Sequence, residues 1–123
     1  MTYEESQEEQ RLLCRQEGCV YYPSEAESIL GLALATIGKL PVSGLRRMPL
    51  VETNGWHVWC GDHPLAYDDF LRLPQNFFSQ ITSRELMAHC PEAVKFLGLP
   101  PGYRFLVSGD HTDVWYDGDI LGP

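Results

Sequence analysis

The stretch that decides the fold is Gly55-Trp56-His57-Val58-Trp59-Cys60-Gly61-Asp62. Apolar and aromatic residues recur at every second position, which is typical of a β-strand whose side chains alternate between two faces. One face carries Trp56, Val58 and Cys60, and we expect it to build the core. The other carries His57 and Trp59, and we expect it to be half exposed. The strand then ends in Gly-Asp, which predicts that it leads into an acidic loop or short helix over residues 62–73.

Further strands are predicted on both sides of this stretch. Residues 41–49 alternate in character and are bounded by prolines, which indicates a strand. Residues 52–55 contain Asn-Gly and predict the turn of an antiparallel pair. Residues 103–107 and 114–116 are rich in β-formers and predict two more strands, with a loop at 109–113 between them.

Helices are predicted at the N-terminus and after residue 81. Residues 3–17 contain no Gly or Pro and end at Gly18, so we expect a helix that lies on the surface or docks only by its C-terminal half. Ser24 and Glu27 have capping-box spacing and predict a short helix. Two more short helices are expected. They span residues 82–89 and the segment from Pro91 to Gly98, with Gly98 as a left-handed cap.

These elements predict one α+β domain over residues 1–123, with residues 1–22 as an N-terminal helical extension. We expect a mainly antiparallel sheet of about four to five strands, with helices packed on one face and the extra N-terminal helix. The apolar run 30–37 is compatible with either a helix or a strand.

The charge of the chain favours some partners over others. Seventeen acidic and nine basic residues give a net charge of −8. Such a chain repels polyanions and attracts basic proteins, so we expect no nucleic-acid partner. An alternative is that the acidity serves only solubility. No apolar run is long enough to span a bilayer, and the acidic N-terminus does not resemble a secretory signal, so we expect a cytoplasmic protein without a membrane partner.

Gly-Asp-His occurs twice, at residues 61–63 and 109–111. Two such loops after strands could meet at one rim of a sheet and hold a metal, which would suit a metal-dependent hydrolase. The spacing is not that of a standard zinc motif, however, so we predict no metal, no cofactor and no catalytic residue. A thiol triad built on Cys60 is disfavoured because Cys60 is in register with the core face. The four cysteines of the chain are expected to be free thiols.

Acidic residues follow both Gly-Asp-His loops, and an exposed Trp beside them would have the composition of a binding hot spot. We therefore predict one protein-binding surface. It comprises Trp59, Asp62, His63, Asp68, Asp69, Asp110, His111 and Asp113. The alternative for Trp59 is that a helix covers it. An exposed Trp59 or the amphipathic N-terminal helix could equally serve a homodimer.

Residues 40–47, 54–62 and 74–77 together resemble the immunity-protein thirty-three-like family of small bacterial proteins. The core of the resemblance is Gly-Trp-x-x-x-x-Gly-Asp at 55–62, and looser likeness extends it over residues 33–107. Cys60 and His63 depart from the pattern, because the family tends to have Ser or Ala and Glu there.

The resemblance implies an immunity factor of polymorphic-toxin or contact-dependent secretion systems, such as type VI secretion. Such a protein would bind a cognate toxin and neutralise it by occluding its active site. No catalytic residue is carried over from the family. A secretion-system adaptor that binds without inhibiting is the alternative within the same class.

Overall fold

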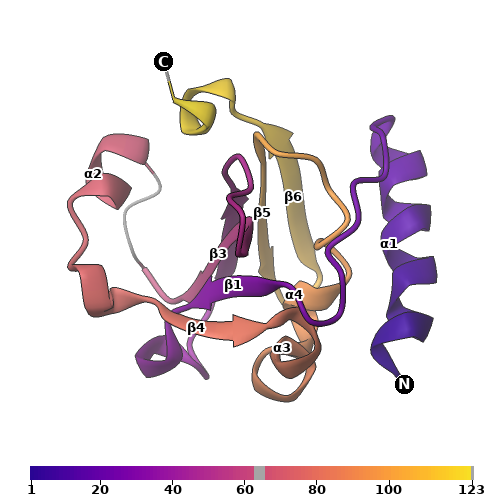
Figure 1. Ribbon diagram of the computed structural model, residues 1–123, viewed down its shortest axis with the longest axis horizontal. Coiled ribbons are helices and arrows are strands. Elements are labelled where there is room, and N and C mark those ends of the chain that lie inside the picture. Colours follow the sequence, from indigo (N-terminus) through magenta and orange to yellow (C-terminus); the bar gives the residue numbers. More distant parts are fainter. Residues whose placement is uncertain (63–65, 123) are drawn as a thin grey trace.

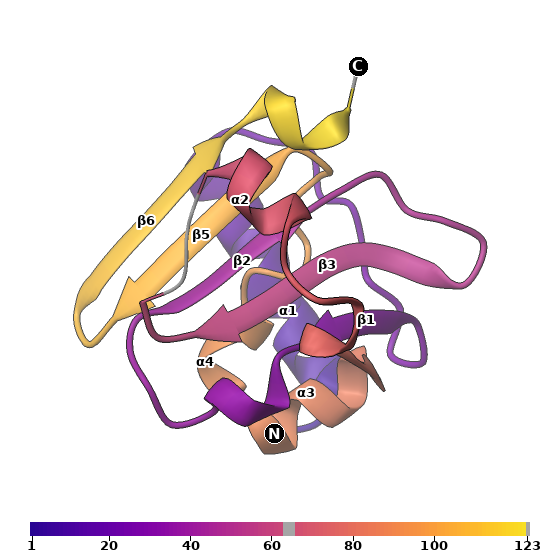
Figure 2. The ribbon, with the colours of Figure 1, turned by 90° about the vertical axis from the view of Figure 1, so that its left-hand side faces the viewer.

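The computed structural model describes residues 1–62 and 66–122. Its centre is a six-stranded sheet (Figures 1 and 2). The strands are β1 (Ile29–Leu32), β2 (Val42–Arg46), β3 (Thr53–Cys60), β4 (Ser79–Thr82), β5 (Tyr103–Ser108) and β6 (His111–Tyr116). Their order across the sheet is β4-β1-β3-β2-β5-β6. Only β1 and β3 pair in parallel, and the other four pairings are antiparallel.

Helices cover both faces of this sheet. The α-helices are α1 (Tyr3–Glu17), α2 (Tyr67–Leu71), α3 (Ser83–His89) and α4 (Pro91–Val94). Short 3-10 helices are η1 (Leu34–Thr36), η2 (Gln75–Phe77) and η3 (Gly118–Leu121). The helices α1, α3 and α4 contribute to a core on one face, whereas α2 and η3 contribute to a second core on the other (Figure 2). We call these the helical face and the α2 face.

The structure confirms the α+β class and the mainly antiparallel sheet, with two corrections. The sheet has six strands rather than four to five, and α2 covers the face that was expected to lack helices. The unexpected strand is β4, which extends only over Ser79–Thr82 and pairs with Ile29–Leu32. β1 and β4 are only four residues long, and each is stabilised by pairing with the other. The sequence of so short a strand therefore contains little pattern from which it could be predicted. For the apolar run 30–37 the sequence allowed either a helix or a strand, and both are present: β1 ends within the run and the 3-10 helix η1 follows it.

Helix α1 begins and ends where the sequence indicates, but it docks along its whole length. Thr2 and Glu5 form a capping box at its start, and Gly18 closes its end with φ 72°. One stripe is buried, and it consists of Tyr3, Ser6, Gln10 and Cys14. Polar anchors fasten this stripe: the Tyr3 hydroxyl donates to the Ser24 carbonyl at 2.6 Å, and the Gln10 amide donates to the Val94 carbonyl at 3.0 Å. The prediction that α1 docks only by its C-terminal half is therefore wrong. It failed because Ser6 and Gln10 are polar, and in the sequence they look like residues that face solvent.

Two local capping predictions also fail. Residues 24–27 form no helix, because the Ser24 hydroxyl donates to the Leu97 carbonyl at 2.6 Å and Glu27 pairs with Arg84 at 2.9 Å. Gly98 is not a left-handed cap. Its hydrogen is needed for close packing, since a Cβ there would lie 2.6 Å from the Tyr21 ring.

Three of the four residues of the predicted turn, 53–55, lie inside β3 instead. Thr53 starts the strand, and the connection from β2 runs through residues 47–52. The pairing of β1 with β3 is irregular next to Gly55, which has φ 91°. A side chain at Gly55 would place its Cβ 2.0 Å from the Arg47 carbonyl oxygen, so only glycine fits. The antiparallel pairing of β2 with β3 is confirmed.

The first predicted face of β3 is confirmed as core. Trp56, Val58 and Cys60 are each at most 1% exposed, on the helical face. Trp56 packs against Phe105 with ring centroids 5.6 Å apart, and Phe105 stacks on Phe96 at 4.2 Å. Aromatic pairs at these distances add to the free energy gained by burial.

A buried arginine anchors the helical face. Arg46 is 1% exposed, and among the described residues it has no carboxylate partner. Its guanidinium donates instead to five backbone carbonyls. They belong to Tyr22 (2.7 Å), Leu99 (2.8 Å), Asn54 (2.9 Å), Leu97 (3.2 Å) and Pro23 (3.4 Å). Burial lowers the pKa of Arg46 to about 10, so the group stays charged at neutral pH. These bonds hold the segments around residues 22 and 97 against the sheet.

Replacing Arg46 should destabilise the fold strongly. Arg46→Met leaves several buried carbonyls without a donor, and we expect the free energy of unfolding to fall by about 3 to 5 kcal/mol. The neighbouring Arg47→Met is the matched control, because Arg47 is only half-buried and contacts the Tyr67 ring at 5.7 Å. It should cost less than about 1 kcal/mol. Urea unfolding followed by tryptophan fluorescence measures both, and equal losses would contradict the role given to Arg46.

Candidate functional site

On the second face of β3, His57 is half-buried as expected, whereas Trp59 is covered. Trp59 is 1% exposed and packs with Phe70 and Phe78, whose ring centroids lie 6.2 and 6.4 Å away. Phe70 comes from α2, and Phe78 lies between η2 and β4. The expectation of an exposed Trp59 is therefore wrong, and the alternative that a helix covers it is correct. Trp59 therefore offers no ring to a partner.

His57 lies in the same aromatic cluster. Its ring meets Phe70 and Phe78 edge-on, with centroids 5.2 and 4.9 Å away. Burial lowers the pKa of His57 to about 4, and the positive charge of Arg47 adds to this effect. The imidazole is therefore neutral at neutral pH. This neutral, half-buried ring packs against Phe70 and Phe78.

The α2 face also contains polar atoms that lack partners. Within residues 1–62 and 66–122, four side-chain atoms of this face are buried without a hydrogen bond. They are Ser43 Oγ, His57 Nδ1, Trp59 Nε1 and Arg104 Nε. They come from three adjacent strands, because Ser43 pairs with Trp59 and Leu45 pairs with both His57 and Arg104. In most protein cores nearly all buried polar atoms have a hydrogen-bond partner. The four unpaired atoms of this face therefore cost folding free energy.

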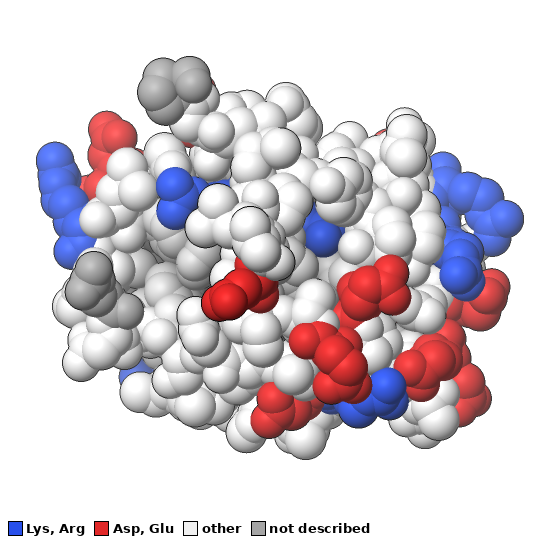
Figure 3. All heavy atoms as spheres, viewed as in Figure 1, with Lys and Arg blue, Asp and Glu red and all other residues white. Residues whose placement is uncertain are grey.

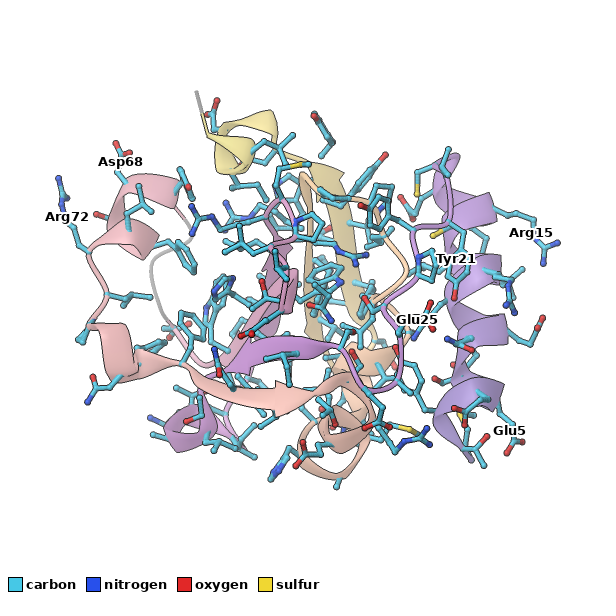
Figure 4. All side chains as sticks on the ribbon, in the orientation of Figure 1. Glu5, Arg15, Tyr21, Glu25, Asp68 and Arg72 are labelled. Carbon is cyan, nitrogen blue, oxygen red and sulfur yellow. The ribbon has the colours of Figure 1, made fainter. Side chains whose placement is uncertain are left out.

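The predicted acidic residues divide into two groups. Asp110, His111 and Asp113 lie at the turn between β5 and β6 and are exposed, and His111 Nε2 contacts Asp113 Oδ2 at 2.9 Å. The turn is tighter than expected, because β6 already begins at His111. Asp68 and Asp69 belong to α2, where Asp69 pairs with Arg72 at 3.3 Å. Figure 4 shows Asp68 and Arg72 pointing outward from α2.

Asp68 borders a groove of about 470 Å³ at the other end of β6. The groove lies between α2 and the end of β6, and it is lined by Ala66, Tyr67, Asp68, Arg104, Asp117 and Asp119. Arg104 Nη1 donates to Asp117 Oδ2 at 3.0 Å, and its guanidinium lies 5.5 Å from the Trp115 ring centroid. The Arg104 side chain is 5% exposed and keeps its Nε donor free. The groove thus combines three carboxylates with one buried cation.

Sequence reasoning missed Asp117 and Asp119 as members of this site. A signal was present, because the chain after Arg104 contains four aspartates and no Lys or Arg. What the sequence could not show is which of these aspartates face α2. Asp117 caps η3, since its Oδ1 accepts from the Asp119 backbone at 3.2 Å, and this turn directs both residues to the groove.

The two Gly-Asp-His segments start at the same end of the strands. Cys60 at the end of β3 and Val107 near the end of β5 both pair with Val42 of β2, the strand between them. Asp62 is exposed at this end of the sheet, and His63 lies outside the described residues. Among residues 1–62 and 66–122, no group of three or more His, Cys, Asp or Glu side chains could hold a metal ion.

Comparison with known protein families identifies the chain. A family model, the Imm33-like domain, matches residues 9–117. The chain belongs to the Imm33-like family. The match begins inside α1 and is wider at both ends than the residues 33–107 on which the resemblance rested. No curated protein and no solved structure matches the chain.

Two further features concern the partners of this Imm33-like protein. No helix within the described part of the chain is long and apolar enough to cross a membrane. The features that suggested a homodimer, Trp59 and the apolar side of α1, are both buried within the chain itself. A second acidic region lies over the N-terminal half of α1 and the loop after the helix (Figure 3), where Glu4 and Glu27 both pair with Arg84.

His57 predicts a specific loss of stability in acid. Its folded pKa of about 4 lies below the unfolded value of 6.5, so the unfolded chain takes up the proton first as the pH falls. Above pH 6.5 the neutral ring makes its full contribution to the free energy of unfolding. As the pH falls from 6.5 to 4, this free energy decreases by up to about 3 kcal/mol. His57→Phe should remove this part of the pH dependence, whereas His89→Phe, at an exposed position of α3, should retain it. Urea unfolding at several pH values measures the difference, and identical pH profiles for wild type and His57→Phe would contradict the assignment.

Proposed function

We propose that this protein is an immunity protein that binds a cognate bacterial toxin and neutralises it by occluding the toxin's active site, without catalysis of its own. Membership of the Imm33-like family, over residues 9–117, carries the proposal. The proposed site of action is the cytoplasm of the cell that produces the toxin.

The charge of the chain supports a basic partner. At a net charge of −8 the protein attracts cationic surfaces over a Debye length and repels nucleic acids. Toxins that cleave nucleic acids or disturb membranes commonly have basic active sites. An acidic inhibitor therefore associates quickly with such a site and competes directly with its substrate.

The groove between α2 and the end of β6 is the centre of the proposed contact surface. Neither Asp68 nor Asp119 has an ion-pair partner among the described residues, whereas Asp117 is compensated by Arg104. Two uncompensated carboxylates suit a lysine or arginine side chain of the toxin.

The turn between β5 and β6 extends the proposed surface along the outermost strand. Asp113 pairs with Leu106, which pairs with Ser43, so Asp113 lies on the α2 face. β6 spans six residues, or about 17 Å, between the groove and the turn. Asp62 and Asp110, from loops at one end of the sheet, would complete the rim.

Growth rescue tests the function itself. The toxin encoded beside this gene is expressed in a sensitive bacterium with or without the protein, and we expect co-expression to restore growth. The adaptor alternative predicts that the two proteins co-purify while the cells still die. Failure to bind and failure to rescue together would overturn the proposal.

Charge removal tests the contact surface. Asp68→Asn with Asp119→Asn should slow association with the toxin about 3- to 10-fold at low salt, and the effect should shrink at high salt. Glu9→Gln with Glu17→Gln is the matched control, because it removes the same charge from exposed positions of α1. Stopped-flow or biosensor measurements give the association rate. Equal slowing by both pairs would show that only net charge matters and would refute this groove as the contact surface.

A further inference from the structure

The four cysteines are free thiols and fall into two neighbouring pairs. Cys14 and Cys19 lie together at the end of α1, and Cys60 and Cys90 lie together in the core of the helical face. The chain therefore contains two possible dithiols, and they differ in how they are held and how far solvent reaches them.

The contact between Cys14 and Cys19 follows from the way α1 ends. The Cys19 amide donates to the Cys14 carbonyl at 3.0 Å, and the Gly18 amide donates to the Arg15 carbonyl at 3.2 Å. With Gly18 in the left-handed conformation, this is a Schellman motif. The motif brings the side chains at its first and last positions together, and in this chain both are cysteines. Arg15 and Tyr21, labelled in Figure 4, mark this end of the helix.

The two pairs differ in access. Cys19 is half-buried, whereas its partner Cys14 is 2% exposed and donates its thiol to the Gly98 carbonyl at 3.2 Å. Cys60 and Cys90 are 1% and 2% exposed, so neither can meet a solute without opening of the fold. A thiol reacts with an oxidant in proportion to its exposure and thiolate character. Only the first pair has a member that solvent can reach.

We propose that Cys14 and Cys19 are an oxidative modification site, which hydroperoxides convert into a disulfide. The Cys19 thiolate attacks a peroxide oxygen and breaks the O–O bond, which gives a sulfenic acid and releases hydroxide. The Cys14 sulfur then displaces the sulfenic hydroxyl and forms the S–S bond, while the Cys14 proton leaves with that hydroxyl as water. In total, two thiols and one hydrogen peroxide give one disulfide and two waters. Cys14 takes this second role because it is buried next to Cys19 and does not itself meet the oxidant.

Peptide mapping of the folded wild-type protein tests the proposal. The sequence places the cysteines in four separate tryptic peptides, namely 12–15, 16–39, 48–72 and 85–95. Each pairing therefore gives its own cross-linked product. After dilute hydrogen peroxide and alkylation, we expect a mass loss of about 2 Da and a link between peptides 12–15 and 16–39. The buried Cys60–Cys90 pair is the internal control and should form at least about 10-fold more slowly, unless urea is added.

Two variants separate the steps. With Cys14→Ser, Cys19 should stop at the sulfenic acid, which dimedone traps. With Cys19→Ser, Cys14 should stay unmodified under the same conditions. Far-UV circular dichroism checks that both variants are folded, and the wild-type map needs no variant at all. A Cys60–Cys90 link that forms as fast, or a Cys19 that is oxidised without capturing Cys14, would overturn the proposal.

Discussion

The fold depends on a buried positive charge that is stabilised by backbone carbonyls. Moving a guanidinium out of water is costly unless every donor finds an acceptor. Arg46 meets this requirement with five carbonyls from three separate segments. One of these, the Leu97 carbonyl, also accepts from Trp56 Nε1 and Ser24 Oγ. The loop before β5 and the segment after α1 are thereby fixed to the sheet at a single point.

This anchor makes the two faces of the sheet unequal. On the helical face the polar groups around Arg46 are paired, and the aromatic rings of Trp56, Phe96 and Phe105 fill the remaining space. On the α2 face a five-residue helix covers a cluster of aromatic rings, and several polar atoms stay unpaired. Among the described residues, the helical face has two unpaired buried atoms of its own, Gln10 Oε1 and the Tyr21 hydroxyl oxygen, against four on the α2 face, and the charged groups of the groove lie at the margin of the α2 face.

The distribution of charge supports the proposed binding of a basic partner. Carboxylates at the groove are held by secondary structure, with Asp68 on α2 and Asp117 capping η3. Arg104 beneath them is fixed by Asp117 and Trp115. A preorganised site of this kind loses little side-chain entropy on binding. The oxidisable pair at the end of α1 belongs to the other side of the molecule, as Figure 1 shows from the positions of α1 and α2.

The sequence by itself determined the features that depend on neighbouring residues. The alternation in residues 55–60 placed Trp56 and Trp59 on opposite faces, the capping residues set the ends of α1, and the Gly-Trp-x-x-x-x-Gly-Asp core indicated the family. Tertiary structure decided what covers each face. Trp59 is buried because α2 folds over it, β4 exists because β1 offers it an edge, and Asp117 joins Asp68 across about fifty residues of sequence. The free energy of such long-range contacts comes from burial shared between distant segments, which no local pattern records.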